Sequence, residues 1–250
     1  MARFLNAPPP ARREWAYFLD FDGTLLNLAP TPDAIVVDAA LPILLDDLRR
    51  ACDGAVAVIS GRALADLERH LAVPALITAG QHGLERRDAS GRLHRHAPPP
   101  QAKEAIRRGL SPFLAGHAGV FLEDKGATLA LHYRQAPELG AEAQRLLQRL
   151  VAEADHGLAV QSGKYVVEIR LAGIDKGTAL AEYLAEPPFR GRRPVFVGDD
   201  RSDEHGFVAV NERGGISIGV GASPLNARYR LPAVGAVRAW LAGATGRPGP

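Results

Sequence analysis

The stretch YFLDFDGTLL, residues 17–26, decides the fold. It starts as an apolar strand and then places Asp20 and Asp22 two residues apart, followed directly by Gly23 and Thr24. Side chains alternate along a strand, so both carboxylates share one side if the strand continues, whereas glycine and threonine are typical of a turn. Two carboxylates held close together repel each other unless one is protonated or a cation lies beside them. This stretch therefore predicts a buried strand that ends in an acidic site.

Composition narrows the class of protein. The chain has 250 residues, 46% of them hydrophobic, which is enough for one large domain or two modest ones with a buried core. Its 30 basic and 28 acidic residues nearly balance, so neither nucleic acid nor a membrane surface is expected as a partner. Cys52 is the single cysteine, which excludes an intrachain disulfide and favours a reducing compartment. With no apolar run near ~18 residues and no signal-peptide core, we expect a soluble, cytoplasmic protein. We predict no oligomer and expect a monomer.

Both ends of the chain carry the same alternation of strands and helices. Between residues 15 and 79, short apolar segments alternate with amphipathic ones, and the pattern returns after residue 173. Nearly continuous apolar strands are typical of a parallel sheet that is covered on both faces and joined by right-handed crossovers. We therefore predict an α/β fold with a Rossmann-like, doubly wound parallel sheet, built from residues 1–87 and 173–250.

The middle of the chain, residues 88–172, follows a different pattern of helix, strand and strand, given twice. Apolar residues recur at helical spacing in the second helix, so this helix can cover one face of a four-stranded antiparallel sheet. We predict an inserted α+β domain of the αββαββ type. The other face of its sheet displays polar side chains, namely Glu123, Lys125, His132, Arg134 and Glu168, with Lys164 in a hairpin.

Four polar clusters follow apolar strands or begin a helix of the predicted parallel sheet. In such sheets, ligands bind at the carboxyl ends of the strands. The clusters are residues 20–24, residues 60–62, residues 175–177 and residues 198–204. Their common position predicts that they converge on one site.

The residue types in these clusters suit the transfer of a phosphoryl group. Asp20, Asp22 and Asp199 offer the hard oxygen ligands that Mg²⁺ prefers. Lys176, at the start of a helix, and the Ser60 hydroxyl can bind phosphate oxygens. The chain has no Walker A loop, no Ser/His/Asp order and no Cys/His zinc spacing. An aspartate can itself attack phosphorus, which gives an acyl phosphate that water then hydrolyses.

At this point the sequence resembles the haloacid-dehalogenase-like (HAD) phosphatases, whose first motif, D-x-D-G-T, stands here as residues 20–24. The resemblance implies that Asp20 is the nucleophile and that Asp22 is the general acid and base. It also implies that the main-chain carbonyl of Asp22 completes the shell of a bound Mg²⁺, and that the inserted α+β domain is a cap domain of the C2 type. The remaining motif roles then fall on Ser60, Lys176 and Asp199, with Asp203 in a supporting role near the metal.

The segments EDKG, LHYR and GKYVVE of the predicted cap, together with AGQHG and FVGDDRSDE, resemble the trehalose-6-phosphate phosphatases from about residue 16 to residue 240. This resemblance implies hydrolysis of trehalose 6-phosphate to trehalose and phosphate, the last step of trehalose biosynthesis. The substrate-binding residues that we expect are Gly23, Arg62, His82, Glu123, Lys125, Arg134, Lys164 and Glu168.

Some alternatives stay open from the sequence. The same chemistry can act on another sugar phosphate, for example sucrose phosphate or glucosylglycerol phosphate, and a phosphomutase or a non-catalytic sugar-phosphate sensor are further readings. Lys164 is an alternative to Lys176 for the catalytic phosphate contact, although Lys176 is preferred because it begins the core helix that leads to Asp199. His82 and His132 can contact substrate or support the scaffold, and Arg62 can bind substrate or serve as a structural ion-pair partner. Gln81 departs from the family pattern, which leaves its role open.

Overall fold

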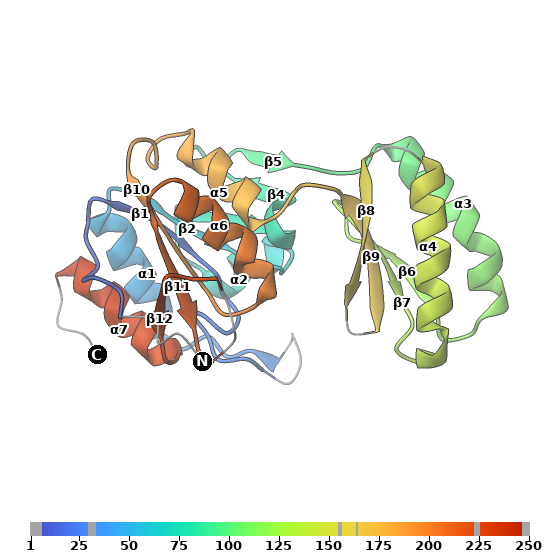
Figure 1. The fold of residues 1–250 in the computed structure, drawn as a ribbon, viewed down its shortest axis with the longest axis horizontal. Helices are drawn as coiled ribbons and strands as arrows, with labels where there is room; N and C mark the ends of the chain where they lie inside the picture. Colours follow the sequence, from blue (N-terminus) through green and yellow to red (C-terminus); the bar gives the residue numbers. More distant parts are fainter. Residues whose placement is uncertain (1–6, 30–33, 155–156, 164, 223–225, 247–250) are drawn as a thin grey trace. The chain divides into compact units, whose positions relative to one another are not determined.

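The structure is a computed structural model that describes residues 7–29, 34–154, 157–163, 165–222 and 226–246. It divides into two compact units (Figure 1): a core unit of Met1–His94 and Ile174–Pro250, and an inserted unit of Arg95–Gly173. Among the described residues, no helix is long and apolar enough to cross a membrane.

One mixed sheet of eight strands, counted over the described residues, forms the centre of the core unit, in the order β12-β11-β10-β1-β2-β3-β4-β5. The five strands from β11 to β3 and the edge strand β12 run parallel, and β4 runs antiparallel to β3. The strands are β1 (Trp15–Leu19), β2 (Val56–Ile59), β3 (Ile77–Gly80), β4 (Glu85–Arg87), β5 (Leu93–Arg95), β10 (Arg193–Gly198), β11 (Ile216–Val220) and β12 (Tyr229–Leu231).

Helices cover both faces of this sheet. Tyr17 packs against Trp240 at 6.0 Å between ring centroids, whereas the next residue, Phe18, stacks on Tyr183 at 6.2 Å. Successive strand residues point to opposite faces, so the helices that carry Trp240 and Tyr183 lie on opposite sides. The helices are α1 (Ala40–Ala51), α2 (Leu64–Leu71), α5 (Lys176–Leu184), α6 (Glu204–Glu212) and α7 (Val234–Thr245), with the 3₁₀ turns η2 (Gln81–Gly83) and η4 (Arg201–Asp203).

The inserted unit has its own antiparallel sheet and its own hydrophobic core. Over the described residues the strand order is β6-β7-β9-β8, and apolar residues such as Leu131 and Val167 bury one face against two helices. The helix stripe predicted from the sequence takes part in this core through Ala143 and Leu147. The elements are α3 (Pro100–Gly116), β6 (Phe121–Asp124), β7 (Leu129–His132), η3 (Pro137–Leu139), α4 (Gly140–Ala154), β8 (Leu158–Gly163) and β9 (Val166–Leu171).

These observations confirm the predicted fold class, a mostly parallel α/β core with a separate antiparallel insert. Strands β4, β5 and β12 were not predicted, because segments such as ERR and LHR have no apolar alternation. Strand β5 joins the core sheet, and the inserted unit begins at Arg95 and ends at Gly173, where the sequence suggested residues 88 and 172.

Candidate active site

The strand order of the core sheet reverses beside β1, which is the place where such sheets bind ligands. From β1 the chain continues to β2 and β3 on one side, and it returns through β10 to β12 on the other side. In the register, Leu19 pairs with Val197 of β10 and with Val58 of β2. The residues that follow these three strands, among them Asp20 and Ser60, therefore lie at one edge of the sheet.

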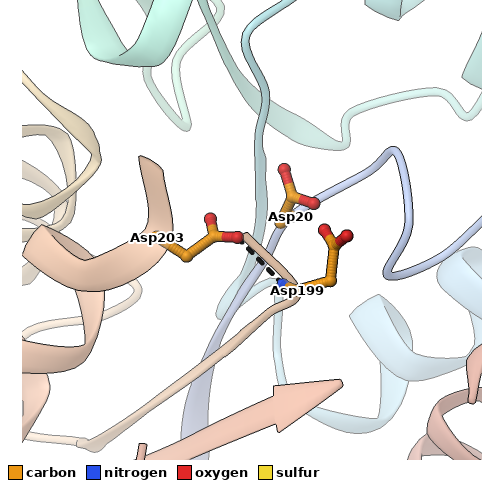
Figure 2. Close-up of side chains that lie close together, drawn as sticks. All are labelled: Asp20, Asp199 and Asp203. Atoms are coloured by element: carbon orange, nitrogen blue, oxygen red, sulfur yellow. Dashed lines mark hydrogen bonds between the residues drawn. The ribbon is translucent and has the colours of Figure 1, made fainter. Parts of the chain in front are cut away.

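A cluster of three aspartates lies at this edge (Figure 2). Carboxylate oxygens of Asp20, Asp199 and Asp203 all lie within 4.8 Å of one another. Asp203 is fully buried and is held by the backbone, because its Oδ2 accepts hydrogen bonds from the N–H groups of Asp199 at 2.9 Å and Asp200 at 3.1 Å. Thr24 Oγ1 lies 3.4 Å from Asp199 Oδ1. These contacts fix the acidic groups before any ligand arrives.

Lys176 lies inside the same cluster. Its side chain is only 2% exposed, and Nζ lies 2.6 Å from Asp20 Oδ1 and 2.6 Å from Asp203 Oδ1. The lysine begins helix α5, whose N-cap Asp175 accepts a hydrogen bond from the Thr178 N–H at 2.9 Å. A buried ammonium group that is bound to two carboxylates is held in one rotamer, so it orients the Asp20 side chain.

The cluster carries more negative than positive charge. Burial raises the pKa of Asp20 to about 6 and that of Asp199 to about 6, and it raises the pKa of Asp203 to about 7. Burial would lower the pKa of Lys176, but the carboxylates of Asp20 and Asp203 outweigh it and raise that pKa. Three carboxylates and one ammonium group leave a charge of about −2 when all are ionised, which matches a divalent cation.

The donors fit a hard cation such as Mg²⁺, which takes oxygen ligands from one or two carboxylates and keeps several waters. Asp203 uses Oδ1 for Lys176 and Oδ2 for two backbone N–H groups. Asp20 and Asp199 are therefore better suited to contact a cation directly, with Asp203 behind them. A metal site is consistent with the cluster, and the identity of the cation is treated below.

The structure separates the side chain of Asp22 from the three-aspartate cluster. Strand β1 ends at Leu19, and the chain then turns, with Leu25 N–H donating to the Phe21 carbonyl at 2.9 Å. The alternation that would place both motif carboxylates on one side therefore stops after Asp20. The Asp22 carboxylate instead pairs with Arg62, at 2.8 Å from Nε and 2.8 Å from Nη2. The expected metal contact of its main-chain carbonyl stays a prediction.

Gly23 provides room for the acidic cluster. A Cβ atom at this position would lie 2.1 Å from Asp199 Oδ2, and the backbone has a φ of +83°. Both the left-handed backbone and the close approach of the carboxylate require glycine here. This explains why a glycine follows the two aspartates of the opening motif.

We expect Gly23→Ala to displace Asp199 and to lower kcat/KM about 10²-fold, since an ångström of misplacement at a reacting centre has an effect of this size. If a divalent cation raises the Tm of the wild type, that increase should be smaller in this variant. The matched control is Gly91→Ala, because Gly91 has the same φ of +83° but has nothing within 4 Å of its Cβ position. Equal losses in both variants would attribute the effect to backbone strain instead.

The second polar cluster lies beside the first. Ser60 is buried, and its Oγ accepts a hydrogen bond from the Arg62 N–H at 3.1 Å. Its carbonyl accepts a hydrogen bond from the His82 N–H at 2.9 Å. His82 adopts a φ of +58° in η2, and its ring lies so close to Gly61 that a Cβ there would be 2.7 Å away. The motif serine, Arg62 and His82 are thus joined through their backbones.

In the inserted unit, the predicted sugar-binding side chains lie on the sheet face opposite the helices. His132 Nε2 lies 2.8 Å from Glu123 Oε2, and Lys125 Nζ lies 2.6 Å from Glu168 Oε1. Arg134 lies over the ring of Tyr165, at 5.6 Å from its centroid. We call the set Glu123, Lys125, His132 and Glu168 the polar face. Lys164 lies outside the described residues.

Two features of these sites were not predicted from the sequence. Thr24 belongs to the first polar cluster but was interpreted only as a turn residue, although its hydroxyl reaches Asp199. Gln161 of β8 pairs in register with Glu168, and its side-chain oxygen is buried without a hydrogen-bond partner among the described residues. Alternation along β8 could have indicated Gln161, because it places this residue on the same face as Glu168.

The fold and the site define the class of protein. A doubly wound sheet with an aspartate after the first strand, a buried lysine and an acidic cluster is the arrangement of the haloacid-dehalogenase-like proteins, whose solved structures share this fold. The family model described as trehalose-phosphatase matches residues 18–234. The chain belongs to the trehalose-phosphatase family.

Relatives agree with this assignment, and a solved structure shares the fold. The chain is 46% identical over 219 residues to the probable trehalose-phosphate phosphatase of Sinorhizobium fredii, which covers 87% of this chain and 82% of the relative. It is 41% identical over 242 residues to the trehalose-6-phosphate phosphatase of Escherichia coli, and this alignment covers 96% of this chain and 90% of the relative. The structure of the C. albicans trehalose-6-phosphate phosphatase C-terminal domain superposes with a TM-score of 0.73 at 22% identity. The match covers 98% of this chain and 99% of that domain and shows that the two share a fold.

Proposed function

We propose that this protein hydrolyses trehalose 6-phosphate to trehalose and phosphate through a phosphoaspartate intermediate. The chemistry rests on one observation, the buried Asp20 carboxylate held by Lys176 within a cluster of acids at the switch point of the sheet. The substrate rests on the family and on relatives at 41% and 46% identity. A non-catalytic sensor is disfavoured, because it would not need the attacking acid.

The cation that we propose is Mg²⁺, held by Asp20 and Asp199, with Asp203 and the carbonyl of Asp22 in support. When bound, it would neutralise charge between the phosphate and the attacking carboxylate. Lys176 contributes a fixed positive charge beside Asp20, and we assign to the Ser60 hydroxyl a hydrogen bond to a phosphate oxygen. The two groups hold the phosphoryl group in line with Asp20.

The reaction then takes two steps. In the first, a carboxylate oxygen of Asp20 attacks phosphorus and the bond from phosphorus to the sugar oxygen breaks, while Asp22 gives its proton to that oxygen. In the second, Asp22 takes a proton from water, and the water oxygen attacks phosphorus and releases phosphate. Asp20 is restored as a carboxylate and Asp22 is again protonated, so the cycle closes.

The polar face of the inserted unit would read the sugar. Carboxylates and ammonium groups are suited to hydroxyls, and a site built on such hydrogen bonds rejects analogues that leave its polar groups unpaired. We assign substrate contacts to Glu123, Lys125, Arg134, Lys164 and Glu168, and contacts near the phosphate to Gly23 and His82. The monomeric state and the cytoplasmic location stay predictions.

A phosphate-release screen tests this function. Trehalose 6-phosphate, sucrose phosphate, glucosylglycerol phosphate and glucose 6-phosphate are compared with Mg²⁺ and with a chelator. We expect the highest kcat/KM for trehalose 6-phosphate, loss of activity with chelator, and recovery when Mg²⁺ is returned. Similar kcat/KM values across the panel would contradict the substrate, and a product that keeps its phosphate would indicate a mutase.

We expect Glu168→Ala to lower kcat/KM for trehalose 6-phosphate by about 10- to 100-fold and to leave p-nitrophenyl phosphate within about 3-fold, because the aryl ester has no sugar hydroxyls to pair. The control is Glu153→Ala on α4, whose side chain is 65% exposed in a long ion pair with Arg149. Equal losses on both substrates in the Glu168 variant would remove the polar face from substrate selection.

A further inference from the structure

Arg62 forms a two-sided clamp between the opening motif and helix α2. Its Nε and Nη2 bind the two oxygens of Asp22 at 2.8 Å each, and its Nη1 lies 3.1 Å from Asp66 Oδ2. The guanidinium lies over the buried ring of Phe21 at 5.8 Å, and only 10% of the side chain is exposed. Three of its nitrogens are therefore engaged with carboxylates.

The backbone of Arg62 is fixed as well. Its N–H donates to Ser60 Oγ, and its carbonyl accepts from the Gln81 N–H at 2.7 Å. Asp66 lies in the first turn of α2, beside His70 and the exposed Arg69 of the same helix. A planar fork held at both ends presents one fixed geometry to its partner carboxylate.

The clamp leaves part of the Asp22 carboxylate accessible. Each carboxylate oxygen has two lone-pair sites, and the two parallel bonds from Arg62 use one site on each oxygen. The Asp22 side chain remains 30% exposed, so the carboxylate can be reached from solvent. A short acid on a turn would otherwise sample several rotamers, and proton transfer needs the carboxylate within about 3 Å of the reacting oxygen.

We propose that Arg62, anchored by Asp66, is a positioning residue that holds the Asp22 carboxylate for proton transfer, and that it is not a direct contact of the phosphate. This inference rests on the proposed function, because it takes Asp22 as the group that protonates the leaving sugar oxygen. It replaces the substrate contact expected for Arg62 from the sequence.

A comparison of two leaving groups distinguishes this positioning role from a structural role and from a phosphate contact. An alkoxide leaving group such as trehalose needs a proton, whereas p-nitrophenolate leaves without one. We compare Arg62→Lys, which keeps the charge but loses the fork, with Arg62→Ala, and measure single-turnover release of the leaving group from both substrates with Mg²⁺. The matched control is Arg69→Ala, since Arg69 also pairs with Asp66 but its side chain is 73% exposed.

Both Arg62 variants should slow trehalose release by about 30-fold or more, and p-nitrophenolate release should change by less than about 3-fold. The following water step should slow for both substrates, so with p-nitrophenyl phosphate in excess over enzyme a burst of p-nitrophenolate should precede a slower steady state. Asp66→Asn should show the same pattern with a smaller loss, of about 3- to 10-fold, and Arg69→Ala should match the wild type.

Equal slowing of both leaving groups would overturn the proposal in favour of a structural role. A raised KM for both substrates with unchanged kcat would overturn it in favour of a phosphate contact. Circular dichroism and the Tm of each variant identify a folding defect, and Arg62→Lys is the variant that should retain the fold. If the wild type hydrolyses glucose 6-phosphate but not trehalose 6-phosphate, the proposed substrate fails, and the same comparison is made with the glucose ester.

Discussion

Replacing Asp20 with asparagine is expected to lower kcat for phosphate release by about 10³-fold or more, because the attacking oxygen is lost. The side chain keeps its size at a position that is 4% exposed, so the fold should survive. Phosphate release from trehalose 6-phosphate measures the effect. Acid-quenched wild-type protein should carry phosphate on Asp20, and the variant should carry none.

Asp53→Asn serves as the control for Asp20→Asn, because its side chain is 82% exposed in a surface pair with Arg192. Mass spectrometry of the purified variant excludes conversion of the new asparagine back to aspartate. Turnover close to that of the wild type, without such conversion, would take the nucleophile's role from Asp20 and would defeat the two-step scheme.

Lys176→Met should affect both stability and activity. It removes the charge that two buried carboxylates share, and an uncompensated buried charge lowers the free energy of unfolding by about 3–5 kcal/mol. We also expect kcat to fall about 10²-fold, because Asp20 loses its orientation. Urea unfolding and phosphate release measure the two effects. Lys103→Met, at the ion pair with the half-exposed Asp124, should change the unfolding free energy by less than about 1 kcal/mol.

The loss in Lys176→Met should depend on pH. Burial raises the pKa of Asp20 to about 6 and that of Asp203 to about 7 from the usual 3.8, so the folded state binds more protons than the unfolded one over this range. Stability therefore falls as pH rises from about 4 to 7. Lys176 offsets this, and its own raised pKa keeps it charged throughout. The deficit of the variant, measured in chelator, should be smaller at pH 5 than at pH 8, and an equal deficit would contradict this account.

The sequence predicted those parts of the molecule that obey simple periodicity. The sequence pattern predicts which residues are buried in apolar strands such as β1 and β2 and in the apolar stripe of α4. It does not predict short polar strands such as β4. The acids after β1 and β10 could be expected to meet, because parallel strands end at the same edge. The position of the Asp22 carboxylate away from the three-aspartate cluster could not be predicted. It depends on the turn after Leu19 and on Arg62, a residue forty positions away.

The hydrophobic cores of the two units have no residue in common over the part of the chain that the structure describes. The phosphoryl chemistry is assigned to one core and the polar face to the other. Substitutions that retune the polar face therefore need not disturb the packing that orients Asp20 and Lys176. Substrate recognition can therefore change, in evolution or by design, through substitutions in the polar face, while the acidic cluster of the core unit stays unchanged.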